Sequence, residues 1–337
     1  MNWLALDIGG ANLKAADGKG FAESYAFALW REPNRLAQEL RTIIAEAPPC
    51  DHLAVTMTGE LADCFESKAA GVQHILKAVH AAADGRHTRV YLTDGMLVSP
   101  QVAIMKPLLA AASNWHALAR FCGRYATSGS AVLIDIGSTT SDIIPLVDGQ
   151  PAAIGKTDTE RLLSRELVYT GVERSPICGL VRSVPYRSQV CPIALEFFAT
   201  TRDVWTILGE LPEDASEKRT ADGRPATKAA ARSRLGRLVC ADDDEFNHRD
   251  AALMAEAIAD AQTQSIAAAL KEVIARLPIA PSTIILSGHG EFLARRALES
   301  LQLSPATVSL SREWRAGISR SAPAHALAIL AQEAVSK

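Results

Sequence analysis

The chain contains two copies of one local pattern: an apolar strand that ends in aspartate, a glycine-containing turn and a second strand. Asp7-Ile-Gly-Gly-Ala-Asn-Leu-Lys14 is the first copy, and Asp135-Ile-Gly-Ser-Thr-Thr-Ser-Asp142 is the second. Glycine lets backbone N–H groups approach anionic oxygens, and serine or threonine hydroxyls add hydrogen-bond donors. One such hairpin is also an ordinary strand-ending turn. Two copies about one lobe apart predict two lobes whose phosphate-binding turns face each other across a cleft.

A third glycine motif lies near the end of the chain. Ser287-Gly-His-Gly290 follows a predicted strand, Thr283–Ser287, and precedes a predicted helix, Glu291–Glu299. The three motifs in this order resemble the phosphate-1, phosphate-2 and nucleoside-side motifs of the actin, Hsp70 and hexokinase superfamily. The expected fold is therefore α/β: a two-lobed actin-like (ribonuclease H-like) ATPase fold, in which mixed sheets flanked by helices enclose a central cleft.

Hydrophobic periodicity indicates where one lobe ends and the next begins. An amphipathic segment, Ser113–Tyr125, precedes a run of small residues at Thr127–Ser130, and we place the boundary there. The N-terminal lobe then spans residues 1–126 and the second lobe 127–321, and the C-terminal helix within 322–337 is expected to pack back on the first lobe. The other predicted strands and helices are Trp3–Ile8, Leu13–Ala16, Asn34–Glu46, His52–Met57, Lys68–Ala83, Arg89–Leu92, residues 131–146, and Ala251–Arg276.

Charged side chains beside the hairpins are the candidate catalytic groups. Asp7 and Asp135 cannot donate hydrogen bonds to phosphate, so we expect them to bind Mg²⁺, directly or through water, or to act as bases. Lys14 follows the first turn, where its point charge can reach a phosphate. Glu60 follows the predicted strand His52–Met57. It is either a base facing the same cleft or an acid that favours the start of a following helix.

The donors expected to bind phosphate lie in the two turns and are Gly9, Gly10, Asn12, Gly137, Ser138, Thr139 and Thr140. We place Gly288, Gly290 and Arg174 on the substrate or nucleoside side of the site. Arg161 and Arg182 are further arginines in the same part of the chain. Such guanidinium groups either bind a carboxylate or phosphate of the substrate or form ordinary ion pairs.

Composition excludes several classes of partner. The 35 Lys and Arg against 38 Asp and Glu leave a formal charge of −3, without the basic excess typical of proteins that bind nucleic acid or anionic membranes. The N-terminal segment lacks the basic and apolar regions of a signal peptide, and no apolar run approaches the length of about 20 residues that spans a bilayer. We therefore expect a cytoplasmic protein that acts on small molecules.

The six cysteines are scattered and include no C-x-x-C pair. This spacing predicts neither a disulfide framework nor a standard zinc site, and favours reduced, mostly buried thiols. Cys178, Cys191 and Cys240, with His248, would form a zinc site only in a fold that brings them together.

Four stretches resemble the hydantoinase A/oxoprolinase branch of the superfamily, namely Asp7–Asn12, Met57–Leu61, Asp135–Asp142 and Arg161–Pro176. Three more resemble a smaller group within that branch, namely Ser113–Trp115, Glu196–Asp203 and Thr220–Pro225. That group consists of proteins linked to tetrahydromethanopterin-dependent one-carbon transfer, with archaeal members in methanofuran biosynthesis. The resemblance extends over nearly the whole chain.

The resemblance implies a condensation with release of diphosphate. The phenol oxygen of a tyramine derivative would replace the diphosphate of an aminomethyl-furanmethanol diphosphate, with Mg²⁺ as the metal, to build a methanofuran or methylofuran carrier. The partners are then a small-molecule diphosphate and a phenolic amine, while homo-oligomerisation stays open. Two alternatives use the same cleft: an ATP-dependent kinase or oxoprolinase-type amide hydrolase, and a nucleotide- or polyphosphate-binding protein without turnover.

Overall fold

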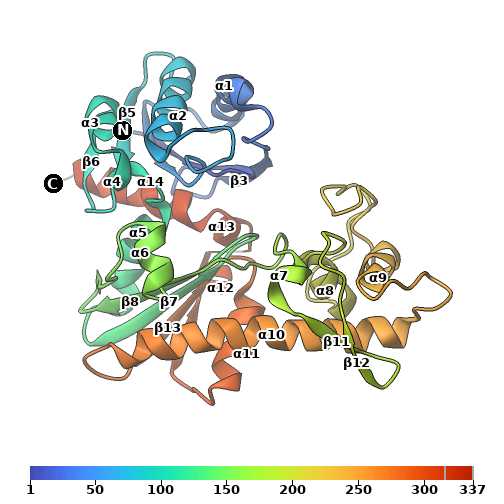
Figure 1. Ribbon diagram of the computed structural model, residues 1–337. Coiled ribbons are helices and arrows are strands. Elements are labelled where there is room, and N and C mark those ends of the chain that lie inside the picture. Colours follow the sequence, from blue (N-terminus) through green and yellow to red (C-terminus); the bar gives the residue numbers. More distant parts are fainter. Residues whose placement is uncertain (315, 336–337) are drawn as a thin grey trace.

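Two mixed β-sheets form the centre of the computed structural model, which describes residues 1–314 and 316–335 (Figure 1). The first sheet has the order β3-β2-β1-β4-β5-β6. Strands β1 and β2 are an antiparallel hairpin, whereas β1, β4 and β5 run parallel. The bounds of these strands are β1 Trp3–Ile8, β2 Asn12–Ala16, β3 Ala22–Ala26, β4 His52–Met57, β5 His87–Tyr91 and β6 Leu97–Val98.

The second sheet repeats this topology. Its order is β10-β8-β7-β13-β14, with β9 paired to β8. Strands β7 and β8 form the antiparallel hairpin, and β13 pairs in parallel with both β7 and β14. The bounds are β7 Ser130–Ile136, β8 Ser141–Val147, β9 Gln150–Pro151, β10 Leu167–Val168, β13 Thr283–Ser287 and β14 Ala306–Ser309. Each sheet therefore presents its hairpin turn at the same edge as the carboxyl ends of its parallel strands.

Side chains of β1 alternate between two helical layers. Leu4, Leu6 and Ile8 pack against helices α1 (Leu36–Glu46) and α2 (Lys68–Ala82) in one hydrophobic core. The opposite face of β1, including Trp3 and Ala5, packs against α5 (Asn114–Cys122) and α14 (Ala322–Val335). Two short helices, α3 Pro100–Met105 and α4 Pro107–Ala110, and the 3-10 turns at Pro33–Arg35 and Gly123–Tyr125 complete this part of the chain.

Helices α5 and α14 are shared by the two sheets. Leu133 and Ile144 of the second sheet pack against Trp115 and Leu118 of α5 and Ala326 of α14. In Figure 1, both helices lie between the two sheets. Because side chains alternate along a strand, Asp7 and Asp135 lie on the faces that carry Ala5 and Leu133, and both faces turn toward this shared layer.

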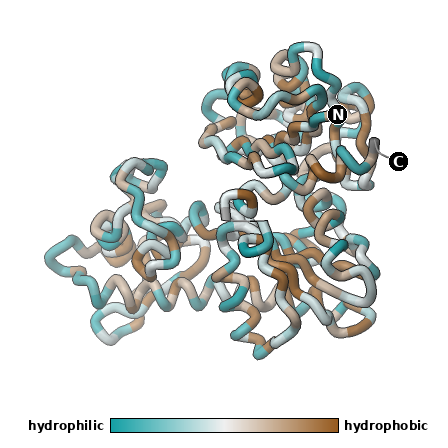
Figure 2. The backbone as a smooth tube through the Cα atoms, turned by 180° about the vertical axis from the view of Figure 1, so that it is seen from behind, coloured by the Kyte–Doolittle hydropathy of each residue, from teal (hydrophilic) through white to brown (hydrophobic). Residues whose placement is uncertain are grey.

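The other face of the second sheet packs on the long helix α10, His248–Ala275. Figure 1 shows that α10 continues past the sheet to a smaller extension, and Figure 2 shows hydrophobic residues concentrated in the strands and hydrophilic ones on the outer loops. The extension contains α7 Ile177–Leu180, β11 Ser183–Tyr186, β12 Gln189–Pro192, α8 Thr201–Leu208 and α9 Lys228–Arg237. The remaining helices are α6 Asp158–Leu163, α11 Glu291–Ser300, α12 Leu310–Trp314 and α13 Ala316–Arg320.

The predicted α/β fold with two mixed sheets and a central cleft is confirmed, and the long predicted elements lie where expected. Helix α10 begins three residues before the predicted Ala251, because Asn247 caps it in a reciprocal pair with Asp250. The C-terminal helix α14 contacts β1, β2 and β4 as well as α5. Within the described ranges, no helix is both long and apolar enough to cross a membrane.

The expectation that most thiols are buried is wrong. All six cysteines are free, Cys122 is buried, Cys64 and Cys240 are exposed, and the other three are partly buried. Several lie at loops and on the peripheral hairpin β11–β12, where the core does not reach them. In the part of the chain that the structure describes, no cluster of three or more His, Cys, Asp or Glu residues has the geometry of a metal site.

Candidate functional site

The two hairpin turns have the same backbone geometry. The Gly9 N–H donates to the Asn12 carbonyl at 3.0 Å, and the Gly137 N–H donates to the Thr140 carbonyl at 2.9 Å. Strand register places Asp7 opposite Lys14 in the first hairpin. In the second hairpin it places Asp135 opposite Asp142. The second strand of each hairpin therefore presents a different charge to the aspartate opposite it: the ammonium of Lys14 in the first lobe and the carboxylate of Asp142 in the second.

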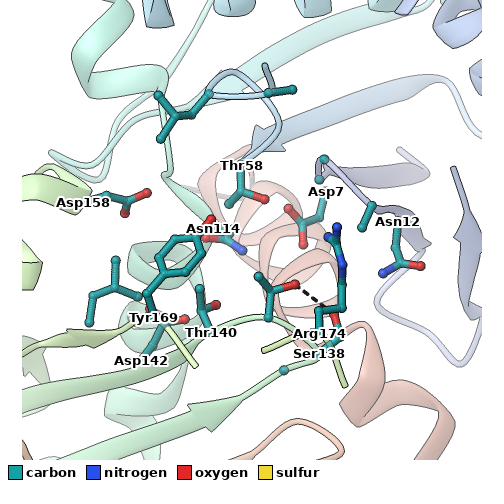
Figure 3. Close-up of a pocket in the computed structure, with 18 of the residues that line it drawn as sticks. Asp7, Asn12, Thr58, Asn114, Ser138, Thr140, Asp142, Asp158, Tyr169 and Arg174 are labelled. Atoms are coloured by element: carbon teal, nitrogen blue, oxygen red, sulfur yellow. Dashed lines mark hydrogen bonds between the residues drawn. The ribbon is translucent and has the colours of Figure 1, made fainter. Parts of the chain in front are cut away.

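A cleft of about 460 Å³ lies between the turns, and we call it the first compartment. Figure 3 shows side chains from both sheets pointing into it, with Asp7, Asn12 and Thr58 facing Ser138 and Thr140. Its lining residues are Asp7, Gly9, Gly10, Ala11, Asn12, Lys14, Trp30, Thr58, Leu61, Ala62, Asp63, Asn114, Asp135, Gly137, Ser138, Thr139, Thr140, Asp142, Asp158, Arg161, Leu167, Tyr169 and Arg174. The structure thus brings together both aspartates, Lys14 and all seven turn residues singled out in the sequence.

The two aspartates are held in unusual electrostatic environments. Asp7 is 2% exposed, and burial raises its pKa although Lys14 Nζ lies 3.5 Å from Asp7 Oδ2. The buried Asp7 Oδ1 has no hydrogen-bond partner among the described residues. Burial and the neighbouring Asp142 raise the pKa of Asp135 to about 6. Both carboxylates would be stabilised by a cation placed between them.

Mg²⁺ fits this arrangement by the chemistry of its donors. In proteins it is held by one or two carboxylates together with water and substrate phosphate, and does not need a cage of three side chains. The unpartnered Asp7 Oδ1 and the carboxylate of Asp135 are such donors. Hydroxyl and backbone groups of the two turns surround them.

Asp142 is already neutralised by the protein. The buried Arg161 pairs with Asp142 and Asp158, and its guanidinium lies over the Trp115 ring at 4.3 Å from the centroid. Sequence reasoning treated Arg161 only as one arginine of several. In the structure its side chain is 2% exposed and it anchors the wall of the cleft to α5.

A second compartment of about 300 Å³ adjoins the first and shares Asn12, Lys14, Asp135, Gly137 and Ser138 with it. Its other lining residues are Ser24, Ala26, Glu173, Arg202, Leu211, Pro212, Asp214, Glu217, Arg219, Gly288, His289, Ser319, Arg320 and Pro323. None of these side chains is a phenylalanine, tyrosine or tryptophan. Its wall is polar and charged.

Glu173 is the most strongly perturbed acid of the second compartment. Burial would raise its pKa, but His289 and Arg202 lower the pKa to about 2. Arg202 pairs with Glu173 at 2.7 Å, and His289 Nε2 lies 3.2 Å from Glu173 Oε1. Glu173 is therefore an anion paired with Arg202, and His289 lies beside it.

The third glycine motif packs directly on the second hairpin. Gly288 has φ +83°, and a side chain there would place Cβ 2.2 Å from the Ile136 carbonyl oxygen. Gly290 donates its N–H to the same carbonyl at 3.0 Å. Gly288 lines the second compartment, whereas Arg174 lines the first. Gly288 and Arg174 therefore line adjoining compartments, and their grouping with Gly290 on the substrate or nucleoside side stays a prediction.

Glu60 lies behind the lining of the cleft. The residue is 1% exposed and is not among the lining residues of either compartment, although Leu61 and Ala62 are. Burial raises the pKa of Glu60 to about 7. The backbone of Glu60 packs against Gly71 of α2, where an added Cβ would lie 2.2 Å from the Glu60 carbonyl oxygen. Its role as a base stays a prediction.

Several lining residues were not among the candidates from the sequence, and Trp30, Asn114 and Tyr169 are the largest polar or aromatic side chains among them. Asn114 begins α5, and its side chain lowers the pKa of Asp7 against the larger effect of burial. Trp30 and Tyr169 belong to loops whose place in the fold no local pattern reveals. The position of Asp142 could be predicted from the sequence. Asp135 and Asp142 are equally far from the centre of the turn, so an antiparallel hairpin pairs them.

Two lobes with the same strand order, and a polar cleft between matching hairpins, place the protein in the actin-like ATPase and sugar-kinase fold class. The chain belongs to the hydantoinase/oxoprolinase family, which matches residues 51–334. The expected family and fold are thus confirmed.

Two curated relatives show which kind of protein within the family this chain is similar to. A protein of Methanocaldococcus jannaschii named (4-{4-[2-(gamma-L-glutamylamino)ethyl]phenoxymethyl}furan-2-yl)methanamine synthase is 30% identical over 341 residues, covering 99% of this chain and 98% of that one. A protein of the same name from Methanococcus vannielii is 30% identical over 203 residues, which are 60% of this chain and 90% of that one.

Solved structures agree on the fold. A PilM–PilN type IV pilus biogenesis complex matches with a TM-score of 0.50 at 15% identity, covering 98% of each chain. The nucleotide-free structure of acetone carboxylase also matches with a TM-score of 0.50, at 10% identity over 97% of this chain and 70% of that one. At such low identity these matches carry information about the fold alone.

Proposed function

We propose that the protein is a synthase of a methanofuran-type cofactor, joining a phenolic amine to an aminomethyl-furanmethanol diphosphate and releasing diphosphate. The full-length similarity to a synthase whose named product contains a phenoxymethyl furan carries the proposal. The matched turns support it, since they offer backbone and hydroxyl donors for a diphosphate beside two carboxylates.

The proposed reaction is a displacement at the methylene carbon of the furan. The phenol oxygen forms the new carbon–oxygen bond, and the bond from that carbon to diphosphate breaks. Its electron pair leaves with the diphosphate. The phenol proton passes to water in the cleft, because Asp7 and Asp135 are the carboxylates that would hold the metal.

Stabilisation of the leaving group is the main task of the protein in this reaction. Negative charge builds up on diphosphate as the bond breaks, so preorganised donors aimed at its oxygens lower the barrier. The N–H groups and hydroxyls of Gly10, Ser138 and Thr139 and the ammonium of Lys14 line the first compartment. Mg²⁺ held by Asp7 and Asp135 would supply further neutralisation of the diphosphate charge.

The proposal also includes the roles of the two lobes, the kind of substrate and the location of the enzyme. Residues 1–126 and 127–321 act as two lobes that hold the substrates between them, with the C-terminal helix packed on the first. The substrates are small charged molecules, and the reaction takes place in the cytoplasm. Among the described lining residues of the second compartment there is no aromatic ring, so an adenine base in that compartment would have no ring to stack on.

A product assay tests the proposal. The purified protein is incubated with Mg²⁺, an aminomethyl-furanmethanol diphosphate and tyramine or its γ-glutamyl derivative, and the aryl ether and free diphosphate are measured together. We expect the two products in equal amounts. Catalytic hydrolysis of ATP, with no reaction of the furan diphosphate, would favour a kinase or amide hydrolase instead.

A further inference from the structure

The lining of the first compartment combines two kinds of side chain. The polar ones include Asn12, Lys14 and Ser138, which also line the second compartment. The aromatic and aliphatic ones include Trp30 from the first lobe and Tyr169 from the second, together with Leu61, Ala62 and Leu167. Aromatic and aliphatic side chains of this kind bind planar rings.

Arg174 lines the first compartment and contacts Trp30. Its guanidinium carbon lies 5.0 Å from the centroid of the Trp30 ring, which makes it a contact between the two lobes. Among residues 1–314 and 316–335, no hydrogen bond or ion pair to the guanidinium is present. Burial lowers the pKa of Arg174, as expected for a cation that lacks an anionic partner.

The backbone fixes Arg174 relative to the second turn. The N–H groups of Glu173 and Arg174 both donate to the Ser138 carbonyl at 3.0 Å, and the Val172 N–H donates to the Gly137 carbonyl at 3.0 Å. Behind this segment, the buried Gln262 amide donates to Thr170 Oγ1 at 2.8 Å. A group bound by the guanidinium is thereby held at a fixed distance from a diphosphate on the second turn.

Tyr169 is within the electrostatic influence of Arg174. Burial and the charge of Asp158 raise the pKa of Tyr169, whereas the charge of Arg174 lowers it. A substrate phenol nearer to the guanidinium and farther from Asp158 would gain stabilisation of its ionised form.

Accepting the proposed synthase function, we infer that Trp30, Tyr169 and Arg174 form the binding site for the phenolic acceptor. The aromatic rings hold the phenol ring, and the guanidinium donates hydrogen bonds to the phenol oxygen. This stabilises the phenolate, which is the stronger nucleophile. Arg174 is thus assigned to the acceptor and not to the diphosphate.

Binding measurements test the inference without turnover. Tyramine and phenethylamine differ only in the phenol hydroxyl, so their affinities are compared by calorimetry in the presence of Mg²⁺ and diphosphate. We expect the wild type to prefer tyramine, and Arg174→Gln to lose about tenfold to hundredfold in tyramine affinity and to remove the preference. Trp30→Ala should weaken both ligands. The exposed arginine Arg182, outside both compartments, provides the control Arg182→Gln, which should change neither.

A second measurement reports the ionisation of the bound phenol directly. Fluorine NMR of bound 3-fluorotyramine gives the pKa of its phenol, which should be lower in the wild type than in Arg174→Gln. Unchanged tyramine affinity in Arg174→Gln, or a loss of diphosphate affinity as large as the loss for tyramine, would overturn the inference. Absence of turnover with tyramine preference intact would overturn the proposed synthase function alone.

Discussion

Asp135→Asn should make the protein more stable while it removes activity. The carboxylate lies at the end of β7, opposite Asp142 across the hairpin, and burial and Asp142 raise its pKa from 3.8 to about 6. Ionised Asp135 therefore costs folding free energy at neutral pH. Asparagine keeps the size of the side chain and carries no charge.

The magnitude follows from the difference between the folded and unfolded pKa values. About two units at 1.36 kcal/mol each correspond to an upper limit of roughly 3 kcal/mol, and water reaching the half-buried carboxylate reduces this to about 1–3 kcal/mol. Between pH 4 and 6 the folded state binds more protons than the unfolded state, so this contribution lowers the stability of the wild type as pH rises. Below about pH 4 the variant and the wild type should have the same free energy of unfolding, and the difference between them should reach its full value above about pH 7.

Urea unfolding of both proteins from pH 4 to pH 8, without Mg²⁺, measures the effect as a difference in free energy of unfolding. The same preparations are assayed for aryl ether formation, where we expect a loss of about 10²-fold or more. Asp244→Asn is the control, because Asp244 is exposed and lies outside both compartments of the cleft. A variant less stable than the wild type at pH 8, or one with full activity, would show that the carboxylate of Asp135 is structural.

Two further predictions concern the ligand and the second turn. Mg²⁺ with diphosphate at a hundredfold excess over Kd should raise Tm by roughly 4 °C, and adenosine alone should do much less; equal shifts with adenosine and ATP would point to a nucleotide enzyme. Gly171→Ala places Cβ 2.5 Å from both the Gly137 carbonyl oxygen and the Thr139 nitrogen, so it should lower the free energy of unfolding by about 2 kcal/mol and weaken diphosphate binding in calorimetry. Unchanged diphosphate affinity in Gly171→Ala would show that the loop containing Gly171 is not part of the phosphate site.

The hairpins were predictable because their signals are local. An apolar strand, a glycine turn and a second strand identify β1–β2 and β7–β8 from the sequence, and two-residue periodicity places Asp7 and Asp135 on one face of their strands. The short strands β3, β10 and β14 had no such signal. They are recognised as strands only by their pairing with neighbours far along the chain.

The contact between Trp30 and Arg174 and the position of Glu60 needed the tertiary structure. The Arg174 guanidinium carbon lies 5.0 Å from the Trp30 ring centroid across two lobes, and no spacing in the sequence encodes that distance. Glu60 follows β4 at a point where either side of the chain could face the cleft. Its backbone packs against Gly71, a contact that can be recognised only once α2 is placed on the sheet.

A difference in charge between the matched hairpins fits the proposed binding of both a cation and an anion in the cleft. Lys14 and Asp142 occupy equivalent positions opposite Asp7 and Asp135, so the first hairpin carries balanced charge and the second carries two acids. Arg161 neutralises Asp142 from within the wall, which leaves Asp135 as the acid of the second hairpin without an ion pair among the described residues. In the proposed function, a metal ion would bind Asp135 and Asp7, while Lys14 would offer its charge to the diphosphate. With two equivalent Asp–Lys hairpins, the cleft would attract anions but would have no reason to recruit a metal.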